Sequence, residues 1–154
     1  MREIRVTIHI DAPIDAVFET VSDHETFACG ADTEYCKLTT EGQQQRNGVG
    51  AIREICVKGL VFIEEITAFV PPSRLNYVVR SITTKSGRRM PVRHELGRVQ
   101  LTEGQGGTQV EWTSRFEINI PFIGGVLEVV AGRQSEKGFR ELLSLAKARL
   151  ESQV

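Results

Sequence analysis

The feature that most constrains the fold of this chain is its opening stretch, where a short strand runs directly into a helix that begins at a proline. Apolar and polar residues alternate over 4–10, with the two-residue period of a half-buried strand. Pro13 suits the first helical position, because its missing N–H would have no partner there. Apolar residues then follow at helical spacing: Ile14, Val17, Phe18 and Val21. The stretch therefore predicts a strand, a sharp turn and an amphipathic helix.

The rest of the chain predicts strand after strand and then one long helix. After the first helix we expect a short polar and helical connection at 24–32 and a helix from about residue 121 to 151. Six further strands are expected at 34–40, 51–57, 60–69, 75–83, 92–102 and 108–120. This order predicts an α+β fold, an antiparallel sheet whose apolar face is covered by the terminal helix. We find no repeat or linker, and expect a single domain over 1–154.

Charge and cysteine content narrow the class of protein. The net charge is −1, from 19 basic and 20 acidic residues, so no global field favours nucleic acid or a membrane surface, and we expect no nucleic-acid partner. No apolar run is long enough to span a bilayer, and no signal-peptide pattern follows Met1. Cys29, Cys36 and Cys56 make an odd count without paired spacing. We therefore expect reduced thiols in a cytoplasmic protein.

Several stretches resemble the START-like (SRPBCC) superfamily, and within it the polyketide cyclase/dehydrase and lipid-transport group. In chain order they are IHIDAPIDAVFETVSD, NGVGAIREI, EEITAFVPPSRLNYVV and GRVQLTEGQGGTQVEW. The resemblance implies a helix-grip fold, a seven-stranded antiparallel sheet around the C-terminal helix, with two short helices after the first strand and an apolar cavity. Its members include cyclases, lipid and quinone carriers, hormone receptors and chaperone co-factors. It implies no catalytic residue here.

Strand alternation selects the residues that should face the cavity. If Val99 faces inward, Arg93, Glu95 and Gly97 share its face, and the general acid–base candidate His94 points outward. A buried Glu95 would need Arg93 or Arg53 as a partner, although a structural ion pair or a solvated charge is the commoner explanation. The terminal helix should add two valines. The predicted ligand-binding residues are Tyr77, Val79, Arg93, Glu95, Val99, Val110, Trp112, Ser114, Phe116, Val126 and Val130.

The remaining motifs give little evidence for a catalytic, metal-binding or phosphate-binding site. The Gly48-Val49-Gly50 stretch near Arg53 lacks the residues of a phosphate-binding loop, and a hairpin turn explains it better. The scattered histidines match no zinc spacing, and no nucleophile motif is present, so we expect no metal site, no cofactor and no identifiable catalytic residue. The basic residues Lys85, Arg88, Arg89 and Arg93 could attract an acidic head group at the cavity mouth or simply be solvated.

The glycines at the start of the terminal helix allow two interpretations. Gly124, Gly125, Gly132 and Gly138 each cost about 1 kcal/mol relative to alanine inside a helix. Close packing on the sheet or a kink explains them more simply, and a compliant wall that adjusts to a guest is the functional alternative.

Three functional hypotheses follow. The first is a binding or transport protein for a small hydrophobic or amphipathic molecule such as a lipid, quinone or polyketide-like aromatic, with polar groups only at the cavity mouth. The second is a cyclase or dehydratase, with convergent polar side chains deep in the cavity. The third is a protein-interaction module, with a collapsed cavity and an exposed apolar patch. The oligomeric state is not fixed by the sequence.

Overall fold

The computed structural model describes residues 1–153 and contains one seven-stranded antiparallel sheet and two helices. It confirms the α+β helix-grip architecture. The helices are α1 (Ile14–Val21) and α2 (Gly124–Glu151). The strands are β1 (Arg2–Ile10), β2 (Thr33–Thr40), β3 (Ile52–Val57), β4 (Leu60–Val70), β5 (Arg74–Thr84), β6 (Val92–Gly104) and β7 (Gly107–Ile118).

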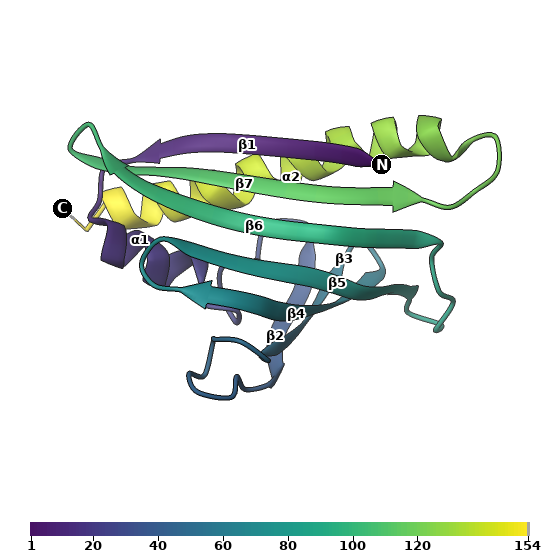
Figure 1. The fold of residues 1–154 in the computed structure, drawn as a ribbon, viewed down its shortest axis with the longest axis horizontal. Helices are drawn as coiled ribbons and strands as arrows, with labels where there is room; N and C mark the ends of the chain where they lie inside the picture. Colours follow the sequence, from purple (N-terminus) through teal and green to yellow (C-terminus); the bar gives the residue numbers. More distant parts are fainter. Residues whose placement is uncertain (154) are drawn as a thin grey trace.

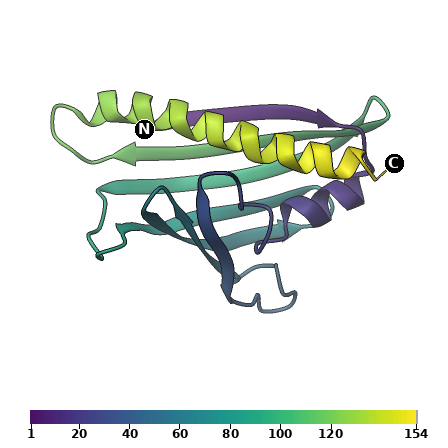
Figure 2. The same ribbon diagram turned by 180° about the vertical axis from the view of Figure 1, so that it is seen from behind.

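The sheet is a meander that ends with its first strand at one edge. Its order is β1-β7-β6-β5-β4-β3-β2, so each strand from β2 to β7 pairs with its sequence neighbour. In Figure 1 the five strands β1, β7, β6, β5 and β4 run side by side, and β3 and β2 turn steeply away from them. Figure 2 shows α2 lying along β1 and β7, and these are the strands it packs against. The concave face of β4–β6 is therefore not packed under α2.

The core lies between α1, the second half of α2 and the concave face of β1 and β4–β7. Alternate residues of the strands point into it, as expected for a half-buried sheet. Val17 of α1 and Leu143 of α2 are completely buried against Val110 and its neighbours. No helix within residues 1–153 is long and apolar enough to cross a membrane.

The connection after α1 and the start of α2 differ from the prediction. Residues 24–28 form turns rather than a second short helix. The terminal helix begins at Gly124 rather than Pro121, because the chain first turns back from β7. A Cβ at Gly132 would lie 3.1 Å from the Arg2 Nε atom and 3.3 Å from Ile4, which supports close packing there, whereas Gly125 and Gly138 have open space.

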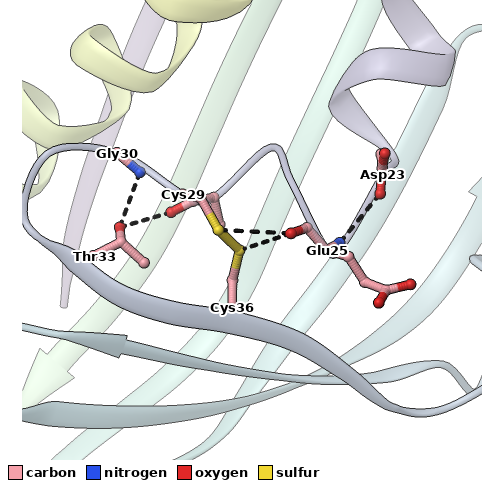
Figure 3. Close-up of a disulfide and its surroundings, with 7 residues drawn as sticks. Asp23, Glu25, Cys29, Gly30, Thr33 and Cys36 are labelled. Carbon is pink, nitrogen blue, oxygen red and sulfur yellow. Dashed lines mark hydrogen bonds between the residues drawn. A yellow bond between two sulfur atoms is a disulfide. The ribbon is translucent and has the colours of Figure 1, made fainter.

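The prediction of reduced thiols is wrong for two of the three cysteines. Cys29 and Cys36 form a disulfide that joins the turns after α1 to β2 (Figure 3). The chain reverses at Gly30–Thr33, where the Gly30 N–H donates to the Thr33 hydroxyl, and this brings the two Cα atoms to 6.0 Å. Sequence spacing alone did not reveal this reversal. Cys56 is a free, buried cysteine.

Candidate functional site

Three polar side chains meet on the concave face of β5, β6 and β7, and of these strands α2 packs extensively only on β7. Tyr77 lies on β5, His94 on β6 and Ser114 on β7. The His94 ring stacks on the Tyr77 ring with centroids 5.6 Å apart and an angle of 13°. The Nε2 atom of His94 lies 3.0 Å from the Ser114 hydroxyl oxygen. We call Tyr77, His94 and Ser114 the concave cluster.

A β-bulge in β6 reverses the predicted orientation of three residues. His94 pairs with Phe116, but Leu96 pairs with Arg115, so Glu95 is an extra residue in the strand. The alternation that places Gly97 and Val99 inside therefore also places His94 inside. Arg93 and Glu95 are exposed, and pair at the outer surface with Glu117 at 2.8 Å and Arg115 at 3.6 Å. Neither lines the interior, contrary to the prediction.

Hydrogen bonding fixes the protonation of His94. Burial lowers its pKa to about 4, so the ring is neutral at pH 7. The Val79 backbone N–H donates to Nδ1 at 3.0 Å, which requires Nδ1 to be the acceptor. Nε2 therefore carries the proton and donates to the Ser114 oxygen. His94 consequently cannot accept a proton from Ser114 through Nε2, and the pair is not a nucleophile with its base.

Tyr77 is held in place through both its ring and its hydroxyl. The Arg53 guanidinium lies over the ring at 4.8 Å, and the Trp112 indole N–H donates to the hydroxyl at 2.8 Å. Burial raises the pKa of Tyr77 well above its usual range, so the phenol stays neutral. Gly97 leaves room for the ring, since a Cβ there would lie 2.2 Å from the ring carbon Cζ.

A second buried polar network adjoins the concave cluster. Arg53 of β3 donates to the Glu64 carboxylate of β4 at 2.6 Å and lies 3.0 Å from the His24 Nδ1 atom. His24 donates through Nε2 to the Asn47 carbonyl at 2.8 Å. Burial, and next the Arg53 charge, lower the pKa of His24 to about 4. With its carboxylate bound to Arg53, Glu64 is not a free base.

The sequence missed this network, although one signal was available. The tight turn at Lys58-Gly59 fixes the β3–β4 register and places Arg53 opposite Glu64. Both charged residues alternate with apolar ones on the face that includes Ile55 and Ile66, both buried. Two opposite charges paired on an otherwise apolar face indicate a buried ion pair.

The predicted apolar residues divide into two groups. Val99, Val110, Trp112 and Phe116 are buried on the concave side, and Val79 is half-buried beside the core. Trp112 does not border an open space, because Phe139 stacks on it at 3.8 Å and Phe27 lies 5.5 Å away. The protein's own side chains therefore fill the interior around Trp112. Contact of these residues with a ligand stays a prediction.

Val126 and Val130 do not face the interior, contrary to the prediction. Their side chains are 66% and 49% exposed. The reason is the rotation of α2. Phe139, Leu143 and Ala146 set its inward side, and Val130 lies on the opposite side of the helix from Phe139.

The surface depressions, the basic loop and the Gly48-Val49-Gly50 stretch do not form part of the concave cluster. A shallow depression of about 460 Å³ lies along one face of α2, and another of about 300 Å³ lies between α1 and the end of α2; neither overlies the concave cluster. In the basic loop Lys85 pairs with Glu34, and Arg89 donates to the Arg80 carbonyl at 3.3 Å. The Gly48-Val49-Gly50 stretch is a turn, and Arg53 points into the interior.

Comparisons with known proteins place the fold. The model of the family described as polyketide cyclase/dehydrase and lipid transport matches residues 1–151. TTHA0849 from Thermus thermophilus superposes with a TM-score of 0.73 at 18% identity, covering 98% of both chains. A START superfamily protein from Mycobacterium smegmatis gives 0.73 at 16% identity over 99% of both chains.

A further structural match comes from a biosynthetic locus. DynU16, a protein in the dynemicin biosynthetic locus, gives a TM-score of 0.64 at 19% identity, covering 97% of this chain and 47% of that one. At these identities the likeness to the solved structures concerns the fold. No curated protein sequence matches the chain.

Proposed function

The chain belongs to the polyketide cyclase/dehydrase and lipid-transport family, and from that premise we propose that it binds a small amphipathic molecule on the concave face of β4–β7, beside the first half of α2. Family and fold fit a protein that binds hydrophobic ligands. The observation that carries the proposal is the concave cluster, a set of neutral, hydrogen-bonded polar groups that continues from β7, on which α2 packs, to β5 and β6, on which it does not pack extensively.

The apolar part of the ligand would lie on half-buried side chains around the cluster. Val79 pairs with Glu64, and Phe62 pairs with both Ile55 and Ile82. Phe62 lies two positions from Glu64 in β4, so it shares the concave face with the buried Arg53–Glu64 pair. Val79, Phe62 and Ile82 are only partly covered by the protein. Burial of their exposed area would provide about 25 cal/mol per Å².

The polar part of the ligand would be recognised by a hydroxyl donor. Since His94 donates to the Ser114 oxygen, the Ser114 hydrogen has no acceptor among the described residues. It is available for a carbonyl, hydroxyl or ether oxygen of the ligand. Lipids, quinones and polyketide-like aromatics all carry such an acceptor next to a large apolar body.

Native mass spectrometry of freshly purified protein tests the proposal. We expect a co-purified small molecule, or saturable binding from a panel of fatty acids, quinones and flat aromatics. Ser114→Ala should weaken binding by about tenfold, the effect of one lost hydrogen bond. Ser81→Ala is the matched control, because Ser81 pairs with Ile63 and so faces the convex side. Equal affinity of the two variants, or no ligand from either source, contradicts the proposal.

A cyclase or dehydratase function is the second candidate. It is favoured by the number of polar side chains that converge inside, since Tyr77, His94 and Ser114 adjoin the Arg53–Glu64 pair. The Ser114 hydroxyl, supported by His94, could polarise a ketone oxygen during carbon–carbon bond formation or water loss. Recovery of a bound polyketone unchanged in mass and structure supports binding alone, and recovery of a cyclised or dehydrated product supports catalysis.

A further inference from the structure

One outward stripe of α2 changes from apolar to cationic along its length. Val126, Val130, Arg133, Lys137 and Arg140 are spaced four, three, four and three residues apart, which places them on a single face of the helix. All five are exposed. The side chains that contact the sheet lie on the other face of α2. This stripe is therefore not used to build the fold.

The apolar end of the stripe continues into the turn before α2. The Phe122 side chain is fully exposed, and Ile123 is 52% exposed. Phe122 also has a φ of 69°, a left-handed backbone conformation that bulky residues rarely adopt. Figures 1 and 2 show that this turn lies at one end of the long axis of the molecule, beyond the strands. The backbone thus carries an unfavourable conformation at a residue whose ring contacts no core.

The cationic end of the stripe lacks partners within residues 1–153. Arg133, Lys137 and Arg140 form no ion pair there, whereas most other basic side chains of the sheet are paired with carboxylates. Glu136 and Glu141 border the same shallow depression as the three cations, but both are half-buried and Glu141 accepts from the Ala31 N–H at 3.2 Å, so the cations outnumber the carboxylates here. The outer face of α2 is therefore locally positive, although the whole chain has a net charge of −1.

We propose that this face of α2 docks on a lipid bilayer that carries anionic headgroups. Phe122, Ile123, Val126 and Val130 would enter the boundary between headgroups and acyl chains, and the three cations would contact the lipid phosphates and carboxylates. An apolar end followed by basic residues on one helix face is the pattern of an interfacial helix. A second copy of the chain fits less well, because this face offers only Glu136 and Glu141, both half-buried and one of them bound to the Ala31 N–H, to meet three cations. The inference goes beyond ligand binding and does not depend on it.

Co-sedimentation of the full chain with vesicles tests the proposal. We expect binding to phosphatidylcholine vesicles that contain about 30% phosphatidylserine, weaker binding to phosphatidylcholine alone, and release as NaCl is raised. Val126→Ser/Val130→Ser should lower the partition coefficient about tenfold or more. Val49→Ser/Val70→Ser is the matched control, since those valines are 45% and 43% exposed on other elements. It should bind as the parent does.

Two further variants separate the apolar and the ionic contributions. Arg133→Gln/Lys137→Gln/Arg140→Gln should lose about tenfold or more in affinity for anionic vesicles and lose the salt dependence. Phe122→Trp should show a blue-shifted emission on anionic vesicles, against the constant background of buried Trp112.

Three results would overturn the proposal that α2 docks on a bilayer. No binding to anionic vesicles, equal binding of the two double-valine variants, or a dimer in solution that Val126→Ser/Val130→Ser abolishes would each overturn the proposal. Ligand binding by Val126→Ser/Val130→Ser should be unchanged, which keeps this test separate from that of the concave cluster.

Discussion

The two halves of α2 are used differently. The second half buries Leu143, Ala146 and Leu150 against the sheet and α1, and the half-buried Phe139 stacks directly on Trp112. The first half contains three glycines and exposes Val126 and Val130 to solvent. Beside it, the concave face of β5 and β6 carries half-buried Val79 and His94. One end of the molecule is thus a packed core, and the other keeps apolar and polar groups available.

This difference shows that only one half of α2 is used to build the core. The packed half supplies the large buried apolar side chains of α2, and the protein's own residues fill the space around them. The open half is supported from behind by the buried Arg53–Glu64 network and by the Tyr77 stack, so its polar groups are held in place. Substitutions in the two halves should therefore have separable effects on stability and on binding.

The largest expected effect comes from the packed half. Trp112→Ala removes the partner of Phe139, Phe27 and Tyr77, and should lower the free energy of unfolding by about 3–5 kcal/mol. Val130→Ala on the exposed side of α2 should change it by less than about 0.5 kcal/mol. Urea unfolding followed by circular dichroism measures both. Similar losses in the two variants would remove the distinction between the halves.

Acidification should destabilise the protein through its two buried histidines. Because folding lowers the pKa of His24 and His94 from about 6.5 to about 4, the unfolded chain binds more protons between these values. Their stability contribution is complete above pH 6.5 and is lost as the pH falls towards 4. At pH 5 the loss should be about 2 kcal/mol for each histidine. His94→Gln should reduce the difference between the free energies of unfolding at pH 7 and at pH 5 by the contribution of His94. If this difference is the same in the variant as in the parent, His94 is not buried in its neutral form.

The disulfide should contribute less than the histidines do together. It joins the turns that carry His24 and Phe27 to β2 across a sequence separation of 7. Closing such a short loop in the unfolded chain is worth about 2–3 kcal/mol. Cys29→Ser/Cys36→Ser, or reduction, should lower the unfolding free energy by that amount, with Cys56→Ser as the control for thiol effects. If reductant leaves the urea midpoint of the parent protein unchanged, the two cysteines do not form a stabilising link.

The smallest stability effect is expected at Gly97. An alanine Cβ would overlap the Tyr77 ring, and displacement of the ring should cost about 1–3 kcal/mol. The same change should weaken ligand binding, because His94 stacks on that ring. Gly104→Ala provides the comparison, since open space surrounds Gly104. Full stability and full binding in Gly97→Ala would show that the Tyr77 position is not constrained.

The sequence predicted the fold well because its signals are periodic. Alternation in the strands and the Lys58-Gly59 turn determine the sheet, and they also placed Tyr77, Trp112 and Ser114 inside correctly. The site was predicted only in part, because one extra residue in β6, Glu95, reverses the face of His94. The exposure of Val130 had a local signal that the prediction did not use, because Val130 lies nine residues before Phe139 and so on the opposite side of α2 from the inward residues.

The most direct test of the central claim is a nuclear magnetic resonance titration with a ligand found by the binding screen. The Val79 amide is a natural reporter, because it donates to the His94 ring at 3.0 Å. We predict saturable shifts of the Val79 and Ser114 amides, with Val110 and Leu143 of the packed half unchanged. Shifts confined to the packed half or to the outer face of α2 would contradict a binding site at the concave cluster.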